Sequence, residues 1–154
     1  MPRFVFRLAP VLRYRERIEE EKKLLLAAAQ RTLAEAETER QRLRDRREAL
    51  ARELVTGHRE FDAETLRMTY AHLDFLAREI NAADWRVAQC RQAVDTARGI
   101  LVRASKDRKI LDRLRERARE NFNREQLRLE QNDLDEANSH LYIRSMHGPQ
   151  GVTT

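Results

Sequence analysis

The sequence predicts an all-α protein, folded as an antiparallel two-helix coiled-coil hairpin whose second helix is longer than its first. Three observations support this fold class. Ala, Leu, Glu, Arg and Gln, which are good helix formers, dominate the 154 residues, while Gly and Pro occur only four and three times. Apolar residues return at heptad spacing along most of the chain. A single short interruption divides the chain into two long helical segments.

The first helix is expected over about residues 10–56. Pro10 suits the first helical turn, where the N–H group that proline lacks would have no partner in any case. No Gly or Pro follows until Gly57, which is placed to end the helix as a C-terminal cap. The expected apolar stripe of this helix consists of Val11, Ile18, Leu25, Ala29, Ala36, Leu43 and Leu50, with Leu33 and Leu54 beside it.

The second helix is expected over about residues 63–146, after a connection at 57–62. Asp62 is a plausible N-cap, and Gly148 and Pro149 end the helix. We therefore expect one coiled-coil domain over residues 1–147 and a disordered tail over 148–154.

Heptad spacing is strongest in the second helix. One series runs Leu66, Leu73, Ile80, Val87, Val94 and Leu101. A second series lies three residues after successive members and runs Leu76, Ala83, Cys90, Ala97, Ala104 and Leu111. Together the two series form one a/d seam of about six heptads, which predicts a left-handed coiled coil.

The two helices differ in length, so part of the second is left without a partner in the hairpin. A short connection predicts antiparallel packing, with Leu43 near Leu76 and Val11 near Arg108. Beyond about Lys109 the second helix should therefore contact nothing in its own chain. Apolar residues nevertheless continue there, so we expect another protein to cover Leu114, Phe122, Leu127, Leu129, Leu134 and Leu141.

The net charge of +5 is unevenly distributed. Residues 1–17 carry five Arg against one Glu, and residues 103–128 carry ten basic against five acidic side chains. Arg outnumbers Lys heavily, which favours forked pairing with carboxylates or phosphates. A nucleic-acid partner is disfavoured because acidic residues are interspersed and no aromatic stacking platform accompanies the basic ones. An acidic protein surface is the expected partner.

Catalytic and metal sites are not expected. Cys90 lies on the seam between Ala83 and Ala97, where a small apolar residue fits. The four His residues are too scattered along the chain to share a metal ion; they are His58, His72, His140 and His147. The sequence also has no glycine-rich phosphate-binding loop. We therefore predict a non-enzymatic protein without a cofactor.

The compartment is expected to be the cytoplasm. Arg3, Arg7 and Arg13 interrupt the apolar residues at the start of the chain, so neither a signal-peptide core nor a membrane-spanning segment can be drawn there.

Three aromatic residues of the second helix point away from the seam or flank it. In the heptad register Tyr70 falls at position e, Phe75 at c and Trp85 at f. Exposed aromatic side chains often anchor protein interfaces, which indicates a docking patch. Two other interpretations stay open: residues 57–70 could cover them, or the register could slip near the connection.

Four segments of the chain carry a family resemblance: FRLAPVLRYRERIEEEKKLLLAAA, LDFLAREI, SKDRKILDRLRERARENF and the closing EQNDLDEANSH. They resemble the FliJ family, a small cytoplasmic component of the bacterial flagellar type III export apparatus. In the closing segment Glu130, Gln131, Leu134, Asp135, Glu136 and Ala137 match the family pattern. Asn132 and Asp133 replace its usual basic and acidic pair.

The resemblance implies a hairpin similar to the central stalk subunit of rotary ATPases. Its terminal end would lie in the ring of the flagellar export ATPase. The resemblance also implies contact with the export gate protein FlhA and an escort role for export chaperones. Membrane association would be peripheral, at the cytoplasmic face of the inner membrane and only through these partners.

Two sets of residues are candidates for these contacts. The hypothetical ATPase-docking set is Arg7, Arg13, Arg113, Arg117, Phe122, Leu127 and Leu134. The hypothetical gate-docking set is Tyr70, Leu73, Phe75 and Leu76.

Three alternatives remain at this stage. The first is the stalk protein of a virulence type III injectisome, which shares this architecture and differs in its partners. The others are a rod that binds nucleic acid, whose affinity would fall steeply with salt, and a purely structural coiled coil.

Overall fold

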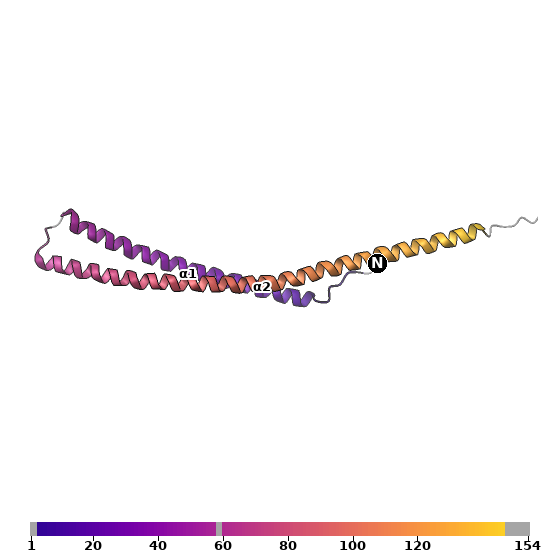
Figure 1. Cartoon of the computed structure of the whole chain (residues 1–154), viewed down its shortest axis with the longest axis horizontal. Coiled ribbons are helices and arrows are strands. Elements are labelled where there is room, and N and C mark those ends of the chain that lie inside the picture. The colour runs from indigo at the N-terminus through magenta and orange to yellow at the C-terminus, as the bar shows by residue number, and fades with distance from the viewer. Residues whose placement is uncertain (1–2, 58–59, 147–154) are drawn as a thin grey trace, which may run out of the picture. The chain divides into compact units, whose positions relative to one another are not determined.

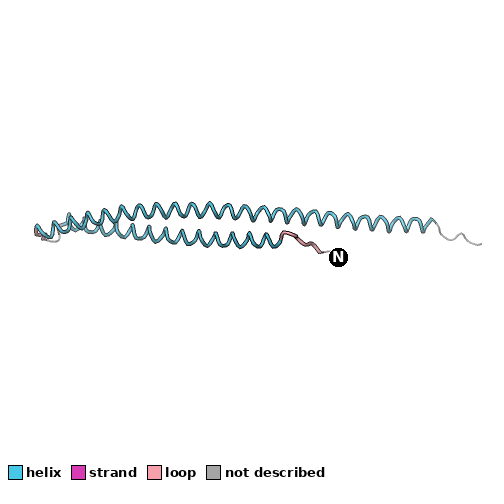
Figure 2. Tube along the Cα trace, turned by 90° about the horizontal axis from the view of Figure 1, so that it is seen from below, coloured by secondary structure: helices cyan, strands magenta, loops and turns pink. Residues whose placement is uncertain are grey.

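The computed structural model describes residues 3–57 and 60–146. It contains two helices, α1 (Ala9–Thr56) and α2 (Ala63–Met146), and no strand within these residues (Figures 1 and 2). The all-α hairpin with a longer second helix is thereby confirmed. α1 begins one residue earlier than predicted, and α2 has the predicted bounds. The tail predicted at 148–154 lies outside the described residues.

The residues that end α1 and begin α2 have the geometry that the sequence predicts. Gly57 adopts a left-handed backbone with φ of 60°, and nothing lies within 4 Å of where a Cβ would be. The backbone conformation, rather than crowding, therefore selects glycine. The Asp62 carboxylate accepts a hydrogen bond of 2.8 Å from the Thr65 N–H. Hydrogen bonding from the Thr65 side chain, and to a smaller degree from this N–H, lowers the pKa of that carboxyl group.

The chain forms two compact units. We call residues 15–107 the hairpin unit and residues 3–14 with 108–146 the arm unit. In the hairpin unit α1 and α2 run side by side in opposite directions (Figures 1 and 2).

The predicted seam of α2 is confirmed over nearly its whole length. Leu76 and Val87 are almost fully buried, each with 1% of its surface exposed, and Val94 and Ala104 are also buried. The other predicted positions are half-buried, except Leu66, which is 37% exposed. Small residues on this seam allow the two backbones to approach closely.

The predicted stripe of α1 is wrong at two positions. Leu12 is buried in place of Val11, and Leu26 is half-buried while Leu25 is 56% exposed. The reason is that polar residues occupy the seam positions in several turns of α1. The apolar residues alone therefore do not determine which side of α1 faces α2. Three of these polar residues are Glu19, which is buried, and the half-buried Lys22 and Arg40.

The predicted pairing of the helices holds to within one turn at Arg15, which lies 3.2 Å from Asp107, but is wrong nearer the connection. It set Leu43 near Leu76, whereas the guanidinium of the neighbouring Arg44 lies 2.9 Å from the Asp84 carboxylate, roughly two turns further along α2. α2 therefore begins beyond the level at which α1 ends (Figure 1). The exposure of Leu66 agrees with this offset.

In the arm unit, part of α2 beyond Lys109 does have a partner in its own chain, contrary to the prediction. Residues 3–8, which we call the N-terminal arm, form no helix and contact α2 at Leu114, Ala118 and Phe122. From residue 127 to 146 every side chain of α2 is exposed. The uncovered part of the helix is therefore shorter than expected.

Candidate protein-docking surfaces

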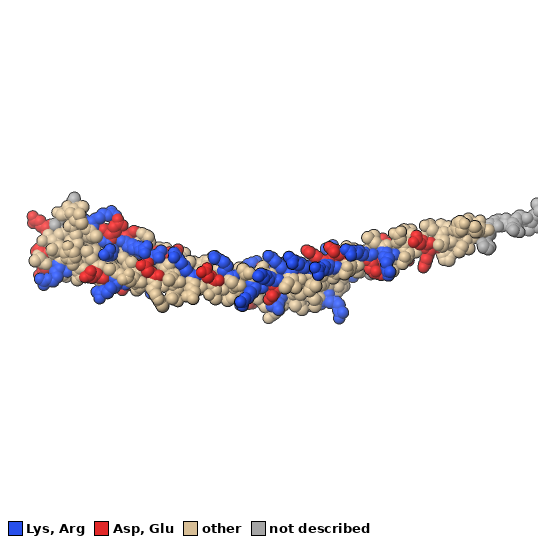
Figure 3. Space-filling model, viewed as in Figure 1, with Lys and Arg blue, Asp and Glu red and all other residues tan. Residues whose placement is uncertain are grey.

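Within residues 3–57 and 60–146, no group of three His, Cys, Asp or Glu side chains could hold a metal ion. In the same part of the chain, neither helix has a stretch apolar enough to span a bilayer. Basic and acidic side chains alternate over the face that Figure 3 shows. Three candidate docking surfaces can be built from the residues upward.

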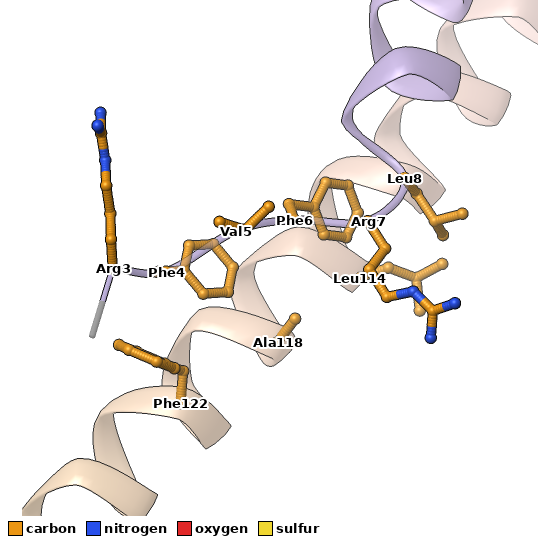
Figure 4. A pocket seen from close by; sticks show the side chains of 9 residues that line it. All are labelled: Arg3, Phe4, Val5, Phe6, Arg7, Leu8, Leu114, Ala118 and Phe122. Carbon is orange, nitrogen blue, oxygen red and sulfur yellow. The ribbon is translucent and has the colours of Figure 1, made fainter.

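The first surface is the groove between the N-terminal arm and α2. The arm is extended, so alternate side chains point to opposite sides: Phe4 and Phe6 are half-buried, whereas Val5 is 76% exposed (Figure 4). The Ala9 N–H donates a hydrogen bond of 3.1 Å to the Phe6 carbonyl, which turns the chain into α1.

The face of α2 beneath the arm consists of residues spaced four apart. Leu114, Ala118 and Phe122 therefore lie along one side of the helix. The rings of Phe4 and Phe122 contact each other with centroids 5.6 Å apart and planes inclined by 54°. Arm and helix leave a cleft of about 860 Å³ between them, with Arg3 and Arg7 at its edge (Figure 4).

The second surface, the open stripe, lies on a different side of α2. Leu127 follows Phe122 by five residues, which at about 100° per residue places it about 140° away around the helix. Arg113, Leu127 and Leu134 are separated by multiples of seven and so share one side of α2, with Arg117 next to them. Both leucines are 65% exposed.

The ATPase-docking set is thus divided by the structure. Arg113, Arg117, Leu127 and Leu134 form the open stripe, whereas Phe122 is covered by the arm. Among the described residues neither Arg113 nor Arg117 makes an ion pair. The other two members lie elsewhere in the arm unit: Arg7 in the N-terminal arm and Arg13 in the first turns of α1.

The third surface surrounds the gate-docking set. Tyr70 and Phe75 are 57% and 49% exposed, as the register predicts, but their spacing of five places them on opposite flanks of the seam. Leu73 is half-buried, and Leu76 has no surface to offer a partner while the hairpin is closed. The His72 ring stacks on Phe75, with centroids 6.2 Å apart.

Sequence reasoning missed the contact between the arm and α2. A signal was present, because Phe4, Phe6 and Leu8 alternate with Val5 and Arg7 directly before the helix. That period of two is typical of an extended segment with one apolar side.

A comparison with protein-family models matches residues 4–147 to the model described as Flagellar FliJ protein. The chain belongs to the FliJ family. Comparisons with curated proteins and with solved structures each found no match. FliJ proteins are components of the flagellar export apparatus and form a non-catalytic family. The matched region begins at Phe4 and therefore includes most of the N-terminal arm.

Proposed function

We propose that this FliJ protein is a non-enzymatic, central-stalk-like rod that links the ring of the flagellar export ATPase to the export gate protein FlhA. The exposed end of α2 is the observation that carries the proposal. From residue 127 to 146 no side chain is buried, yet Leu127, Leu134 and Leu141 repeat at heptad spacing with 65% of each surface exposed. A helix with such a stripe is stabilised when another protein packs against it.

The open stripe is the proposed contact with the ATPase. Its two leucines supply apolar area, and Arg113 and Arg117 supply guanidinium groups that no carboxylate in the described chain occupies. Unpaired Arg side chains beside exposed apolar residues suit an acidic protein surface, because forked hydrogen bonds to carboxylates are strong.

Reversing both charges tests this contact. The double variant Arg113→Glu, Arg117→Glu should bind the purified ATPase about tenfold more weakly or worse, because each new carboxylate faces an acidic partner. The control is Arg42→Glu, Arg46→Glu, which has the same spacing on the exposed side of α1. Because Arg42 also pairs with Glu39 at 3.4 Å, this control includes the loss of an ion pair and so sets an upper bound on the general effect of charge reversal. Equal affinity of the two double variants, measured by calorimetry, would contradict the assignment.

The gate contact is proposed for Tyr70 and Phe75, with Leu73 and Leu76 supporting the helix beneath them. Replacing either aromatic by Ala should weaken binding to the cytoplasmic part of FlhA and leave the melting temperature nearly unchanged, because both rings are largely exposed. Unaltered FlhA binding by the double alanine variant would remove this assignment.

Escort of export chaperones and peripheral association with the cytoplasmic face of the inner membrane are proposed on family membership. Both would act through protein partners and require no nucleic acid. A pull-down from flagellated cells, probed for the ATPase, FlhA and the chaperones together, tests the whole proposal. Recovery of none of them would overturn it.

A further inference from the structure

The N-terminal arm covers a part of α2 that keeps the heptad pattern of the seam. Ala118 comes one heptad after Leu111, and Phe122 comes three heptads after Leu101, so both continue the two seam series. In the hairpin unit these positions face a helix, whereas in the arm unit they face six extended residues. The arm therefore lies where the pattern of α2 suits a packed helix.

The arm covers this row of α2 without filling the space above it. A cleft of about 860 Å³ remains between the two. Leu114 stays 41% exposed beneath the arm, and Leu8 stays 40% exposed within it. Dispersion contacts are lost wherever apolar side chains are left uncovered, so the arm is held weakly. Its best-defined anchor is the contact between the rings of Phe4 and Phe122 (Figure 4).

The covered row adjoins the open stripe and shares its chemistry. Arg117 of the stripe follows Leu114 by three residues, which places it about 60° away around α2. No acidic residue of the described chain lines the cleft, and neither Arg3 nor Arg7 at its edge makes an ion pair there. Apolar area bordered by unpaired Arg side chains on both surfaces suits one and the same acidic partner.

We propose that the N-terminal arm is a strap, which masks Leu114, Ala118 and Phe122 until an acidic, amphipathic helix of the export ATPase displaces it. The proposal rests on the contact of the ATPase with the open stripe and adds a regulation of that contact. Without the ATPase, the strap shields an apolar row from unspecific association. Because the strap must open first, the apparent dissociation constant is the intrinsic one divided by the open fraction.

The opposite arrangement is a clamp, in which the arm stays closed and forms one wall of the binding cleft. The loose packing of the arm favours the strap, since a helix covers more of the row than six extended residues do. The two arrangements differ in the sign of one effect. Weakening the arm raises the affinity for the ATPase if the arm is a strap, and lowers it if the arm is a clamp.

Calorimetric titration of the full chain with the purified ATPase measures this sign. Phe4→Ala removes the ring that holds the arm but leaves Arg7 in place, and should lower the dissociation constant about three- to tenfold. Phe122→Ala, at the other ring of the same contact, should raise the constant about threefold or more, because the partner loses an anchor. Val5→Ala is the matched control and should leave it unchanged, since Val5 is 76% exposed on the outer side of the arm.

Opposite effects at two rings that touch each other would distinguish a strap from a purely structural contact. If the unmodified chain binds the ATPase, an unchanged or weaker affinity of Phe4→Ala would overturn the strap and leave the proposed function standing. If the unmodified chain does not bind the ATPase, the proposed function fails and the strap fails with it. Circular dichroism checks that all three variants keep their helix content.

Trypsin cleavage after Arg7 follows the displacement directly. Adding the ATPase to the unmodified chain should accelerate this cleavage at least about threefold, because the displaced arm is accessible to the protease. The Phe4→Ala variant, whose arm is already open, should show little further acceleration. Slower cleavage of the unmodified chain in the complex would show that the arm stays closed there, which refutes the strap.

Discussion

At the scale of single residues, the burial of the hairpin unit is concentrated in a few side chains. Leu76 and Val87 are each 1% exposed, whereas most seam positions around them are half-buried. A two-helix core leaves little room for redundancy, since no third element covers the seam. Individual substitutions on the seam should therefore have large effects.

Leu76→Ala should lower the free energy of unfolding by about 2–5 kcal/mol, because it removes a fully buried side chain from a packed seam. Urea denaturation followed by circular dichroism at 222 nm measures this loss. The control Leu127→Ala, at a side chain 65% exposed, should stay within about 0.5 kcal/mol of the unmodified protein. Similar losses in both variants would show that the seam is packed differently.

The N-cap of α2 should respond to pH. The hydrogen bonds from Thr65 lower the pKa of Asp62 below 3.8, so its contribution to stability is complete above pH 3.8 and is lost as pH falls through the folded-state pKa. Asp62→Ala should lower the melting temperature near neutral pH. Asp62→Asn should keep the cap but lose this part of the pH dependence. An Ala variant as stable as the original at pH 7 would contradict the role.

At the scale of elements, the N-terminal arm differs from both helices in the interactions that keep it in place. Its described backbone hydrogen bonds, from Ala9 to Phe6 and from Leu12 to Leu8, lie at its junction with α1, and its attachment to α2 depends on side chains such as Phe4 and Phe122. An element without a hydrogen-bond ladder can open without unfolding a helix. The arm is therefore the part of the arm unit most easily released.

Phe4→Ala should increase trypsin cleavage after Arg7 about tenfold, because losing the ring contact raises the population of the open arm. Val5→Ala is the matched control, since Val5 is 76% exposed and lies on the outer side of the arm. Helix content by circular dichroism should be unchanged in both variants. Equal cleavage rates would mean that the Phe4 contact does not hold the arm.

The elements also show which features a sequence can predict. The α2 seam was predictable because apolar residues keep strict heptad spacing from Leu73 to Leu111. The phase of α1 was not, since residues such as Lys22 and Arg40 take seam positions. The helix pairing depends on the path of the connection, which local sequence does not determine.

The candidate site was predictable to a similar degree. Exposure of Tyr70 and Phe75 follows directly from the register. The sequence could not predict that the arm contacts α2, because a six-residue segment with a few apolar side chains does not specify which surface it covers. Phe122 and the leucines of the open stripe lie on different sides of α2, and this follows from their spacing in the sequence. Only the structure shows that the N-terminal arm covers the side with Phe122.

At the scale of the whole molecule, protection from solvent varies strongly along α2. Residues 73–104 include the buried seam of the hairpin unit, whereas residues 127–146 are exposed on all sides. A helix without tertiary contacts is only marginally stable in water. The isolated protein should therefore combine a stable hairpin with a helical end that opens readily.

Hydrogen exchange measured by mass spectrometry should resolve this difference. Amides of residues 127–146 should exchange at least about a hundredfold faster than those of residues 73–104, which corresponds to about 2.7 kcal/mol of additional protection. Adding the export ATPase should slow exchange in the exposed end if the proposed docking is correct. Uniform exchange along α2 in the free protein would contradict the difference in burial.

The spacing of Glu79 and Arg86 has an evolutionary consequence. Positions that touch within one chain, such as Glu37 and Arg91, should covary among FliJ proteins because a charge change on one helix is compensated on the other. Glu79 and Arg86 are exposed and lie seven residues apart along α2, so they cannot touch in one chain. Covariation between either of them and a residue of another export protein would record selection on a contact with that protein. A family alignment would then preserve the history of contacts that the single chain does not display.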